Sequence, residues 1–218
     1  MNLIFELKLL SDTLIGSGEG WGANIDSDIV FDDIGLPYIP AKRVKGCLKE
    51  SAIEIVEMFE NSGIKFATNG DIEMLFGKPG QMRSSMFSFP NCYLSDYESN
   101  RKWLEWLKTK YQELITKEII LGTFTITRQQ TAIDNNGIAK VHSLRTKRVL
   151  KKGSNFSGKI ECNGIEEHLL CLLSLAVSNL RYMGTNRNRG FGCISCNLFD
   201  ENNISLNKKY INHISKVI

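Results

Sequence analysis

The chain opens on alternating apolar and polar positions. From residue 3 to residue 9 every second side chain is large and apolar, a period that is typical of a half-buried β-strand. The stretch 16–24 has four glycines in its first seven residues, which predicts a loop. Residues 28–39 then predict a short hairpin, with its turn at 32–35, where Asp and Gly are concentrated.

Two later stretches have the three- and four-residue spacing of amphipathic helices. The first begins at Pro40, a favoured first-turn residue, carries its apolar face from Val44 to Phe59, and closes at Asn61 and Gly63. The second covers 166–184 and has leucines on nearly all sides, which predicts a buried helix.

A third helix, more polar than these two, is predicted around 98–118. We expect its apolar face to form a buried stripe, consisting of Trp103, Trp106, Leu107, Tyr111 and Leu114.

The remaining apolar stretches predict strands. Residues 120–134 and 155–162 are β-rich and flank a basic insertion at 135–153, while 193–199 predicts a closing strand. The resulting order of strand, hairpin, helix, two strands, helix and strand is close to a ferredoxin-like βαββαβ core. The sequence therefore predicts an α+β fold of the ferredoxin-like class, with a β-hairpin and helices inserted in it.

The composition indicates the class of protein and the cellular compartment to be expected. Of the 218 residues 42% are hydrophobic and 23% charged, as in ordinary globular proteins. The charged residues inside the first apolar run argue against a signal peptide, and no stretch resembles a membrane span, so we expect a cytoplasmic protein without membrane contact. Cys193 and Cys196 form a CxxC pair without a second pair nearby, which favours free thiols over a zinc site.

The charges are unevenly distributed along the chain. Residues 1–60 hold five Lys/Arg against eleven Asp/Glu, whereas 101–160 hold thirteen against four. A segment so basic beside an acidic one suggests a partner that carries phosphates. For 101–117, a solvated lysine-rich helix face explains the basic residues equally well.

Lys42, Arg43 and Lys45 lie in the first turn of the helix predicted at 40–61. Cations there oppose the helix macrodipole and destabilise the isolated helix by a few tenths of a kcal/mol each, on the order of 0.3. Such violations of a local rule concentrate at functional sites, and a helix N-terminus with three cations suits an anion. Alternatively, the long side chains extend into solvent.

Two further basic stretches are candidates for binding a nucleic-acid backbone. In the loop 184–192, glycines allow close approach to a ligand and arginines can hold phosphate with two parallel hydrogen bonds; its candidates are Gly184, Arg187, Arg189, Gly190, Phe191 and Gly192. In the basic insertion, a hairpin can lay cations along a backbone while its apolar tip separates bases; its candidates are His142, Arg145, Lys147 and Arg148. A plain turn and a solvated arm are the corresponding alternatives, and Phe191 is also expected to pack into the core.

Acidic residues at 26–33 offer a candidate for catalysis. Asp26 and Asp28 are two positions apart and would share a face on a strand. Carboxylates are natural ligands of Mg²⁺ in phosphoryl transfer, so Asp26 is a candidate catalytic and metal-binding residue, with turn chemistry as the alternative. Asp32 and Asp33 are assigned to the turn. His142 is a possible general base.

Together these stretches resemble the RAMP superfamily, the RNA-binding subunits of CRISPR effector complexes. The segment GLPYIPAKRVKGCLKE resembles the family's PYIPGSSLKG motif, and LFGKPGQMRSSMFSF, the 131–160 region and GTNRNRGFG resemble later family segments in the same order. The resemblance runs from about residue 14 to 196 and is nearest to backbone subunits of type III complexes, including type III-D-like members.

The resemblance implies a single domain over 1–218 with an RRM-like palm at about 1–60 and 118–200. It also implies a helical insertion at about 61–117 and a thumb hairpin at about 128–158. Guide RNA, target RNA and head-to-tail neighbours of the same family are the expected partners, together with other effector subunits. The family's target-cleaving aspartate aligns with Asp26, with Mg²⁺ as cofactor.

Two alternatives remain open. One is a subunit that binds or caps the same complex without cutting, since the basic AKR replaces the usual small residues before the helix. The other is a metal-independent guide-RNA processing nuclease that uses His142.

Overall fold

The computed structural model describes residues 1–16, 25–78, 80, 85–164 and 166–217. Its main sheet is antiparallel, in the order β2-β4-β7-β1-β8, with β3 also pairing with β7. The strands are β1 (Asn2–Leu9), β2 (Tyr38–Ile39), β3 (Phe87–Ser88), β4 (Cys92–Leu94), β7 (Asn155–Cys162) and β8 (Ile194–Phe199). A separate ribbon pairs β5 (Thr125–Gln130) with β6 (Arg145–Leu150).

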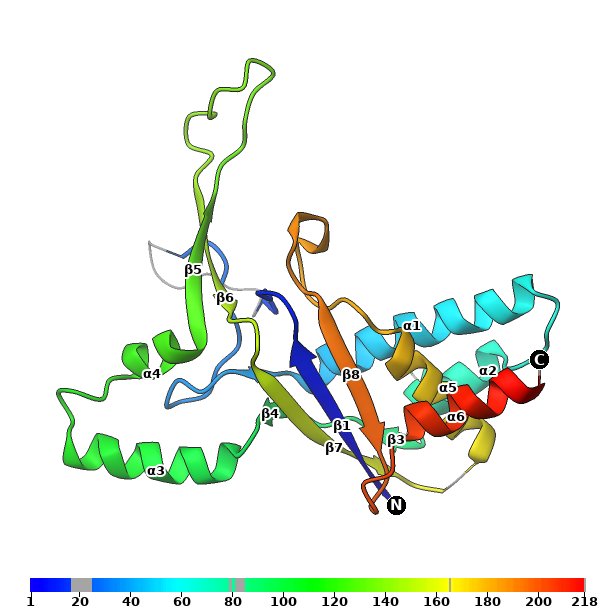
Figure 1. Cartoon of the computed structure of the whole chain (residues 1–218). Coiled ribbons are helices and arrows are strands. Elements are labelled where there is room, and N and C mark those ends of the chain that lie inside the picture. The colour runs from blue at the N-terminus through cyan, green and yellow to red at the C-terminus, as the bar shows by residue number, and fades with distance from the viewer. Residues whose placement is uncertain (17–24, 79, 81–84, 165, 218) are drawn as a thin grey trace.

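The helices are α1 (Ala41–Asn61), α2 (Asn69–Phe76), α3 (Tyr97–Lys110), α4 (Lys117–Phe124), α5 (Glu167–Asn179) and α6 (Leu206–Val217). Read as β1-α1-β4-β7-α5-β8, with sheet order β4-β7-β1-β8, the core has the ferredoxin-like topology, which confirms the predicted fold class. The ribbon and α3–α4 are inserted between β4 and β7. Figure 1 shows the ribbon rising from the sheet, with α3–α4 and the group α1, α2, α5 and α6 at opposite sides.

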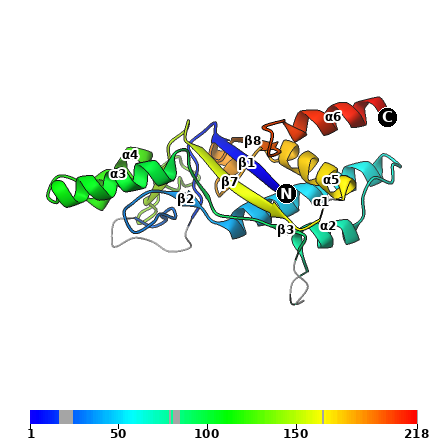
Figure 2. The same cartoon turned by 90° about the horizontal axis from the view of Figure 1, so that it is seen from below.

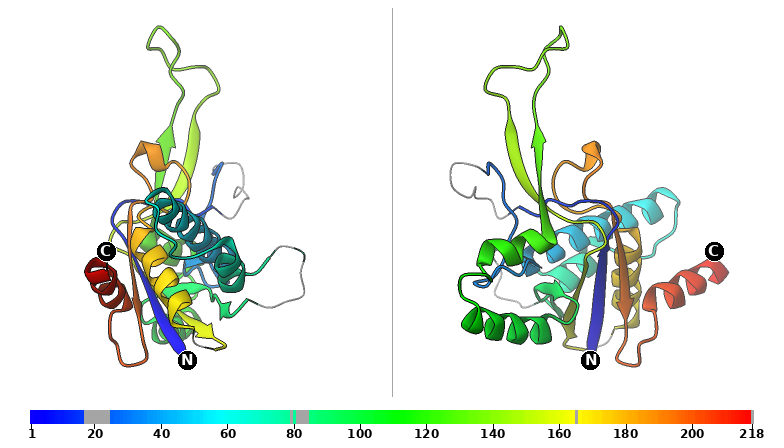
Figure 3. Two further views of the ribbon diagram at one scale, coloured as in Figure 1. Left: turned by 90° about the vertical axis from the view of Figure 1, so that its right-hand side faces the viewer. Right: turned by 60° about the vertical axis from the view of Figure 1, so that its left-hand side comes forward.

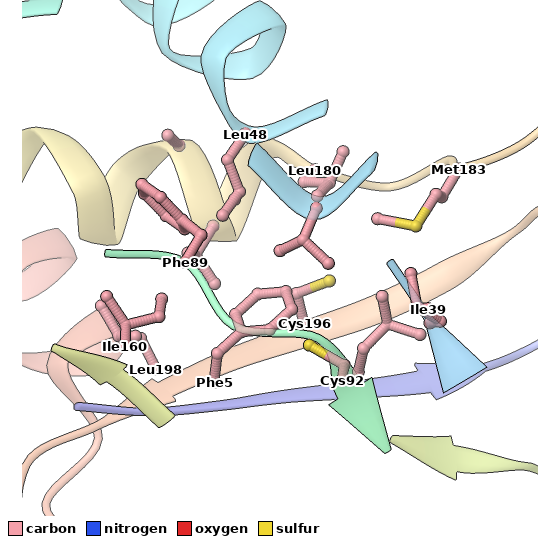
Figure 4. Close-up of a cluster of buried hydrophobic side chains, with 14 of the residues drawn as sticks. Phe5, Ile39, Leu48, Phe89, Cys92, Ile160, Leu180, Met183, Cys196 and Leu198 are labelled. Carbon is pink, nitrogen blue, oxygen red and sulfur yellow. The ribbon is translucent and has the colours of Figure 1, made fainter. Parts of the chain in front are cut away.

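The core lies between the sheet and two helices. Strand β1 buries Leu3, Phe5, Leu7 and Leu9 and exposes the residues between them, as its alternation predicts. Helices α1 and α5 cover this apolar face, and Figure 4 shows their side chains meeting those of the strands. Seen from below, these helices lie together on one side of the sheet (Figure 2).

Both ends of α1 follow the sequence closely. Pro40 is the N-cap residue, and the Ala41 amide donates to Asn91 Oδ1 at 2.8 Å. At the other end, the Gly63 amide donates to the Glu60 carbonyl and Gly63 takes a positive φ of 74°, so the chain leaves the helix there.

The predicted helix at 98–118 is wrong in its extent and in its packing. It divides into α3 and α4, because the chain leaves helical geometry at Tyr111 and Thr116 caps a new helix by accepting from the Ile119 amide. Trp103 and Trp106 are 59% and 54% exposed, and α3 buries no residue fully.

Helix α3 is held by polar contacts of Arg101 and by Tyr97 and Leu104, which are partly buried against the core, and the expected stripe takes no such part. Arg101 donates to Asp32 Oδ2 and to the Tyr97 hydroxyl, both at 3.1 Å, and forms an ion pair with Asp33 at 2.9 Å. Because this anchor fixes the inner face of α3, the tryptophans point outward. Asp32 also accepts from backbone amides within its own turn, including Gly35 at 2.8 Å, as its assignment to the turn predicts.

The inserted segments differ from the predicted ranges. Strands β3 and β4 lie within 61–117, so that segment is not wholly helical. The thumb hairpin was predicted at 128–158, whereas the ribbon with its connecting loop covers 125–150. The first residues of β7 fall within the predicted range but belong to the main sheet. Residues 17–24 of the predicted glycine-rich loop lie outside the described residues.

Two glycines with similar backbone conformations allow a matched test of this fold. Gly184 and Gly190 have φ values of 91° and 80°, but a Cβ at Gly184 would collide with the Leu14 carbonyl oxygen, whereas nothing lies within 4 Å at Gly190. We expect Gly190→Ala to cost about 1–2 kcal/mol of unfolding free energy, from its left-handed backbone alone. Gly184→Ala should cost clearly more. Urea denaturation measures both, and equal losses would contradict the close approach of the two segments.

Candidate nucleic-acid interface

One cleft brings together segments that are far apart in the sequence. Its volume is about 440 Å³, and it lies between the start of α1, the segment before the 28–39 hairpin and the 183–187 loop. Its walls include Gly16, Asp26, Asp28, Lys42, Arg43, Gly46, Cys47, Glu50, Gly184, Thr185 and Arg187. Three of the four candidate stretches from the sequence therefore meet at one place.

The first turn of α1 supplies the cations of the cleft. Lys42 and Arg43 are exposed and line it, and Arg43 Nη2 donates to the Gly16 carbonyl oxygen at 3.4 Å. Lys45 is half-buried and does not line the cleft. The first turn holds no acidic side chain, so no carboxylate of its own offsets the positive end of the helix.

Asp26 lines the cleft and is also bound to the ribbon. Its backbone amide donates to the Thr146 carbonyl at 2.9 Å, and the Thr146 amide donates to Asp26 Oδ2 at 2.8 Å. Arg145 Nη1 lies 3.6 Å from Asp26 Oδ1, and the Asp26 side chain remains 40% exposed. The carboxylate therefore fixes the ribbon near the loop end of its paired strands while staying accessible.

Asp28 and Arg148 form a buried ion pair beside this contact. The distance from Arg148 Nη1 to Asp28 Oδ2 is 2.8 Å, and their side chains are 16% and 4% exposed. Burial raises the pKa of Asp28, while the Ile29 amide and the Arg148 guanidinium act in the opposite direction. Asp28 thus does not share an exposed face with Asp26, and the Arg148 guanidinium is engaged inside the protein.

The 184–192 loop forms the opposite wall of the cleft. Gly184 and Gly192 approach protein backbone, at Leu14 and at Met183 respectively, so both glycines are needed by the fold itself. Arg187 is exposed in the cleft wall, with its Nε donating to the Gly184 carbonyl at 3.0 Å. Phe191 is half-buried and packs against the core.

The ribbon stands next to this loop. Gln130 Oε1 accepts from Lys147 Nζ at 2.9 Å and from Arg189 Nη1 at 3.5 Å, which joins the two segments. Both views in Figure 3 show the loop, in orange, beside the ribbon. His142 is exposed in the loop that connects β5 to β6, has a φ of 58°, and does not line the cleft.

The ribbon end exposes apolar side chains as well as cations. Ile133, Ile138, Val141 and Leu144 are between 57% and 83% exposed. Exposed apolar residues gathered at one end of a ribbon mark a contact surface rather than a core.

Glu50 was not identified from the sequence. It lies on the cleft side of α1, one turn beyond Gly46. Burial raises the pKa of the Cys47 thiol and the Glu50 carboxylate raises it further, whereas Arg187 and Arg43 lower it. The helical spacing from Arg43 to Gly46 and Glu50 is the signal that predicts their shared face.

The residues present set limits on a metal site. Among the described residues no group of three or more His, Cys, Asp or Glu side chains is placed to hold a metal ion. Mg²⁺ is commonly held by one or two carboxylates together with substrate phosphates. Asp26 fits that arrangement only if the phosphates complete the coordination.

The fold and the cleft define a class: a ferredoxin-like protein with an inserted ribbon and a cleft lined by basic and acidic side chains. The sequence model of the RAMP superfamily matches residues 6–195, and the chain belongs to this superfamily. The resemblance in the sequence is thereby confirmed at the level of the family.

Solved structures agree on the fold. A chain in the cryo-EM structure of the Type III-B Cmr-beta bound to cognate target RNA is similar, with a TM-score of 0.65 at 11% identity over 91% of this chain and 97% of that one. A chain of Type III-B Cmr-beta in the apo state gives 0.63 at 14% identity, over 92% and 98%. No curated protein matches the sequence significantly. No helix in the described part of the chain is long and apolar enough to cross a membrane.

The Asp28–Arg148 pair predicts a specific pattern of stabilities. Arg148→Met leaves the Asp28 carboxylate buried without this partner and should cost about 3–5 kcal/mol. Arg148→Met with Asp28→Asn removes both charges and keeps an acceptor for the Ile29 amide, so it should cost less than the single variant. Chemical denaturation measures both.

The control is Arg128→Met on the same ribbon. Arg128 is 53% exposed in its ion pair with Asp12, so its loss should cost about 1 kcal/mol or less. A double variant as unstable as Arg148→Met would contradict the assignment of the cost to a buried carboxylate that has lost its guanidinium partner.

Proposed function

We propose that the chain is an RNA-binding subunit of a type III CRISPR effector and holds the phosphate backbone of the guide RNA in the cleft. The observation that carries the proposal is the meeting of Lys42, Arg43 and Arg187 around one cleft with the N-terminus of α1. Family membership and the likeness to chains of Cmr-beta complexes, one of them bound to target RNA, support it. Neighbouring subunits, target RNA and the guide are then the partners.

Three features of the cleft favour the binding of phosphate. Arginine donates in a planar fork that matches phosphate oxygens. Lys42 and Arg43, in the first turn of a 21-residue helix, line the cleft, and no acidic residue of that turn offsets their charge. The close packing of Gly184 on Leu14 holds the arginine loop at a fixed position beside α1.

The ribbon extends this interface away from the palm. Its exposed apolar residues at 133–144 would contact bases, and Arg145 and Lys147 would lie along the backbone. The role of Arg148 in this scheme is to hold β6 through Asp28, in place of a direct contact with RNA.

Asp26 would cleave the paired target RNA within the assembled complex. It is an exposed carboxylate in the cation-lined cleft, so it is placed beside the proposed path of the backbone. A Mg²⁺ ion held by Asp26 and RNA phosphates would supply charge stabilisation when bound. The hydrogen bond from the Thr146 amide would hold the Asp26 carboxylate in a fixed orientation toward the ion.

A subunit that binds or caps without cutting is the second candidate. The observation in its favour is that Asp26 has a structural task, since it closes the contact between the 25–29 segment and β6. Such a task accounts for an aspartate at this position without catalysis.

The first test concerns the cations. Lys42→Ala with Arg43→Ala should weaken the binding of single-stranded RNA, because contacts with phosphates are lost. The slope of log affinity against log salt should fall by about 0.7 for each lost contact. Lys65→Ala with Lys208→Ala removes the same charge from outside the cleft and should leave the slope unchanged. Equal slopes in all three proteins would contradict the proposed cleft.

The second test separates the two candidates. Asp26→Asn preserves an acceptor for the Thr146 amide and removes the negative charge. In the assembled complex it should leave guide binding intact and reduce target cleavage at the positions that this subunit serves, by at least about 100-fold for a lost catalytic group. Unchanged cleavage at every position would leave the non-cutting subunit as the assignment.

A further inference from the structure

The cleft continues into a second, smaller hollow. This hollow has a volume of about 160 Å³ and lies between α1 and residues 179–182. The two share Cys47, Glu50 and Arg187 in their walls, so together they form one groove along α1.

The charge along this groove reverses. The stripe of α1 that lines it runs from Lys42 and Arg43, past Gly46, to Glu50 and Glu54. These thirteen residues span about 18 Å at the rise of an α-helix. On α1 the first end of the stripe offers cations to a phosphate, whereas the second end offers the carboxylates of Glu50 and Glu54, which face Arg181 and Arg187 in the same hollow.

The wall opposite the carboxylates carries an aromatic ring on fixed backbone. Tyr182 is 48% exposed, lines the second hollow, and pairs with Cys193 in an isolated antiparallel bridge. The neighbouring Arg181 carbonyl accepts from the Ile194 amide at 2.9 Å. The backbone that carries the ring is therefore fixed, and about half of the Tyr182 residue is exposed.

The second carboxylate is oriented from the same side. Asn179 Nδ2 donates to Glu54 Oε2 at 2.8 Å and to Ser51 Oγ at 3.2 Å. A carboxylate only accepts hydrogen bonds, so a ligand group that meets Glu50 or Glu54 is a donor, while Arg181 and Arg187 in the same hollow suit acceptors. Proteins recognise single-stranded RNA bases by stacking an aromatic ring on the base and by hydrogen bonds to its edge. Tyr182 and the carboxylates offer both kinds of contact.

We propose that the second hollow binds one RNA nucleobase with an exocyclic amino group, stacked on Tyr182 and donating to Glu50 or Glu54. This inference rests on the proposed function, because the backbone in the first cleft delivers the base. Such a subsite would make RNA binding depend on the identity of one base, although the phosphate contacts of the cleft do not depend on sequence. A basic peptide is a less suitable occupant, since Arg181 and Arg187 line the same hollow and would repel it.

The matched ligands are short cytidine and uridine oligonucleotides, which differ in having an amino group or a carbonyl at the same ring position. Carboxylates accept from the cytosine amino group. Fluorescence anisotropy with the full chain should show tighter binding of cytidine. Glu50→Gln with Glu54→Gln should abolish that preference, because an amide also donates to the uridine carbonyl. Glu57→Gln with Glu60→Gln, exposed carboxylates of α1 that line neither hollow, should preserve it.

The ring is tested separately. Tyr182→Ala should weaken both oligonucleotides about tenfold, the loss of one base stack, whereas Tyr182→Phe should bind like the wild type. Equal wild-type affinities for the two RNAs, or an unchanged affinity of Tyr182→Ala, would overturn the subsite. So would an oligolysine peptide that binds more tightly than RNA and is released by the double glutamate variant.

Failure of the subsite is distinguishable from failure of the proposed function. If Lys42→Ala with Arg43→Ala weakens RNA binding while the Tyr182 and glutamate variants behave as wild type, only the subsite is wrong. If the double cation variant binds as wild type, the cleft itself is wrong. Thermal unfolding of each variant confirms that the folded protein is compared.

Discussion

The pairing of residues 26–28 with β6 is the constraint on which the rest of the site depends. Asp26 and Thr146 exchange two hydrogen bonds, the Arg148 amide donates to the Ser27 carbonyl at 3.0 Å, and Asp28 binds the Arg148 side chain. These contacts place the ribbon on the palm and Asp26 in the cleft at the same time. Because one set of bonds does both, the cleft and the ribbon have a fixed relation, which a site for an extended ligand requires.

Helix α1 tolerates its cationic first turn because its other face is buried. The cost of the cations is on the order of 0.3 kcal/mol each. Each fully buried large apolar side chain contributes about 1.5–3 kcal/mol. The side chains that α1 buries include Val44, Leu48, Ile55, Val56 and Phe59. Burial therefore decides that the helix forms, and the charges of its first turn are free to serve the cleft.

Elements with a clear period could be predicted from the sequence, whereas contacts between distant residues could not. The alternation of β1 and the apolar face of α1 are local patterns, and both were confirmed. The predicted burial of the apolar stripe of α3 was wrong. Periodicity shows that a helix has an apolar face, but it does not show whether another part of the protein covers that face. Its anchor, Arg101, reaches Asp32 across 69 positions.

The same distinction applies to the site. The cations of α1 could be found because they break a local rule, and Asp26 was proposed from a resemblance. The burial of Arg148 depends on Asp28, 120 positions away, so its charge alone suggested a surface residue. The helical spacing from Gly46 indicates that Glu50 lies on the same face of α1. That this face lines a cleft becomes clear only from the structure, in which Arg187 lines the same cleft.

The carboxylates in the groove argue against a purely electrostatic interface. Two unit charges 4 Å apart interact by about 4 kcal/mol at an effective dielectric of 20, and by about 1 kcal/mol in water. An exposed acid beside a bound phosphate therefore weakens binding, and less so the more water screens the pair. A cleft shaped only for affinity would lack Asp26 and Glu50. Their presence indicates that position matters as much as affinity: Asp26 fixes the ribbon at the cleft, and Glu50 lies where the lysine and arginine of α1 give way to carboxylates.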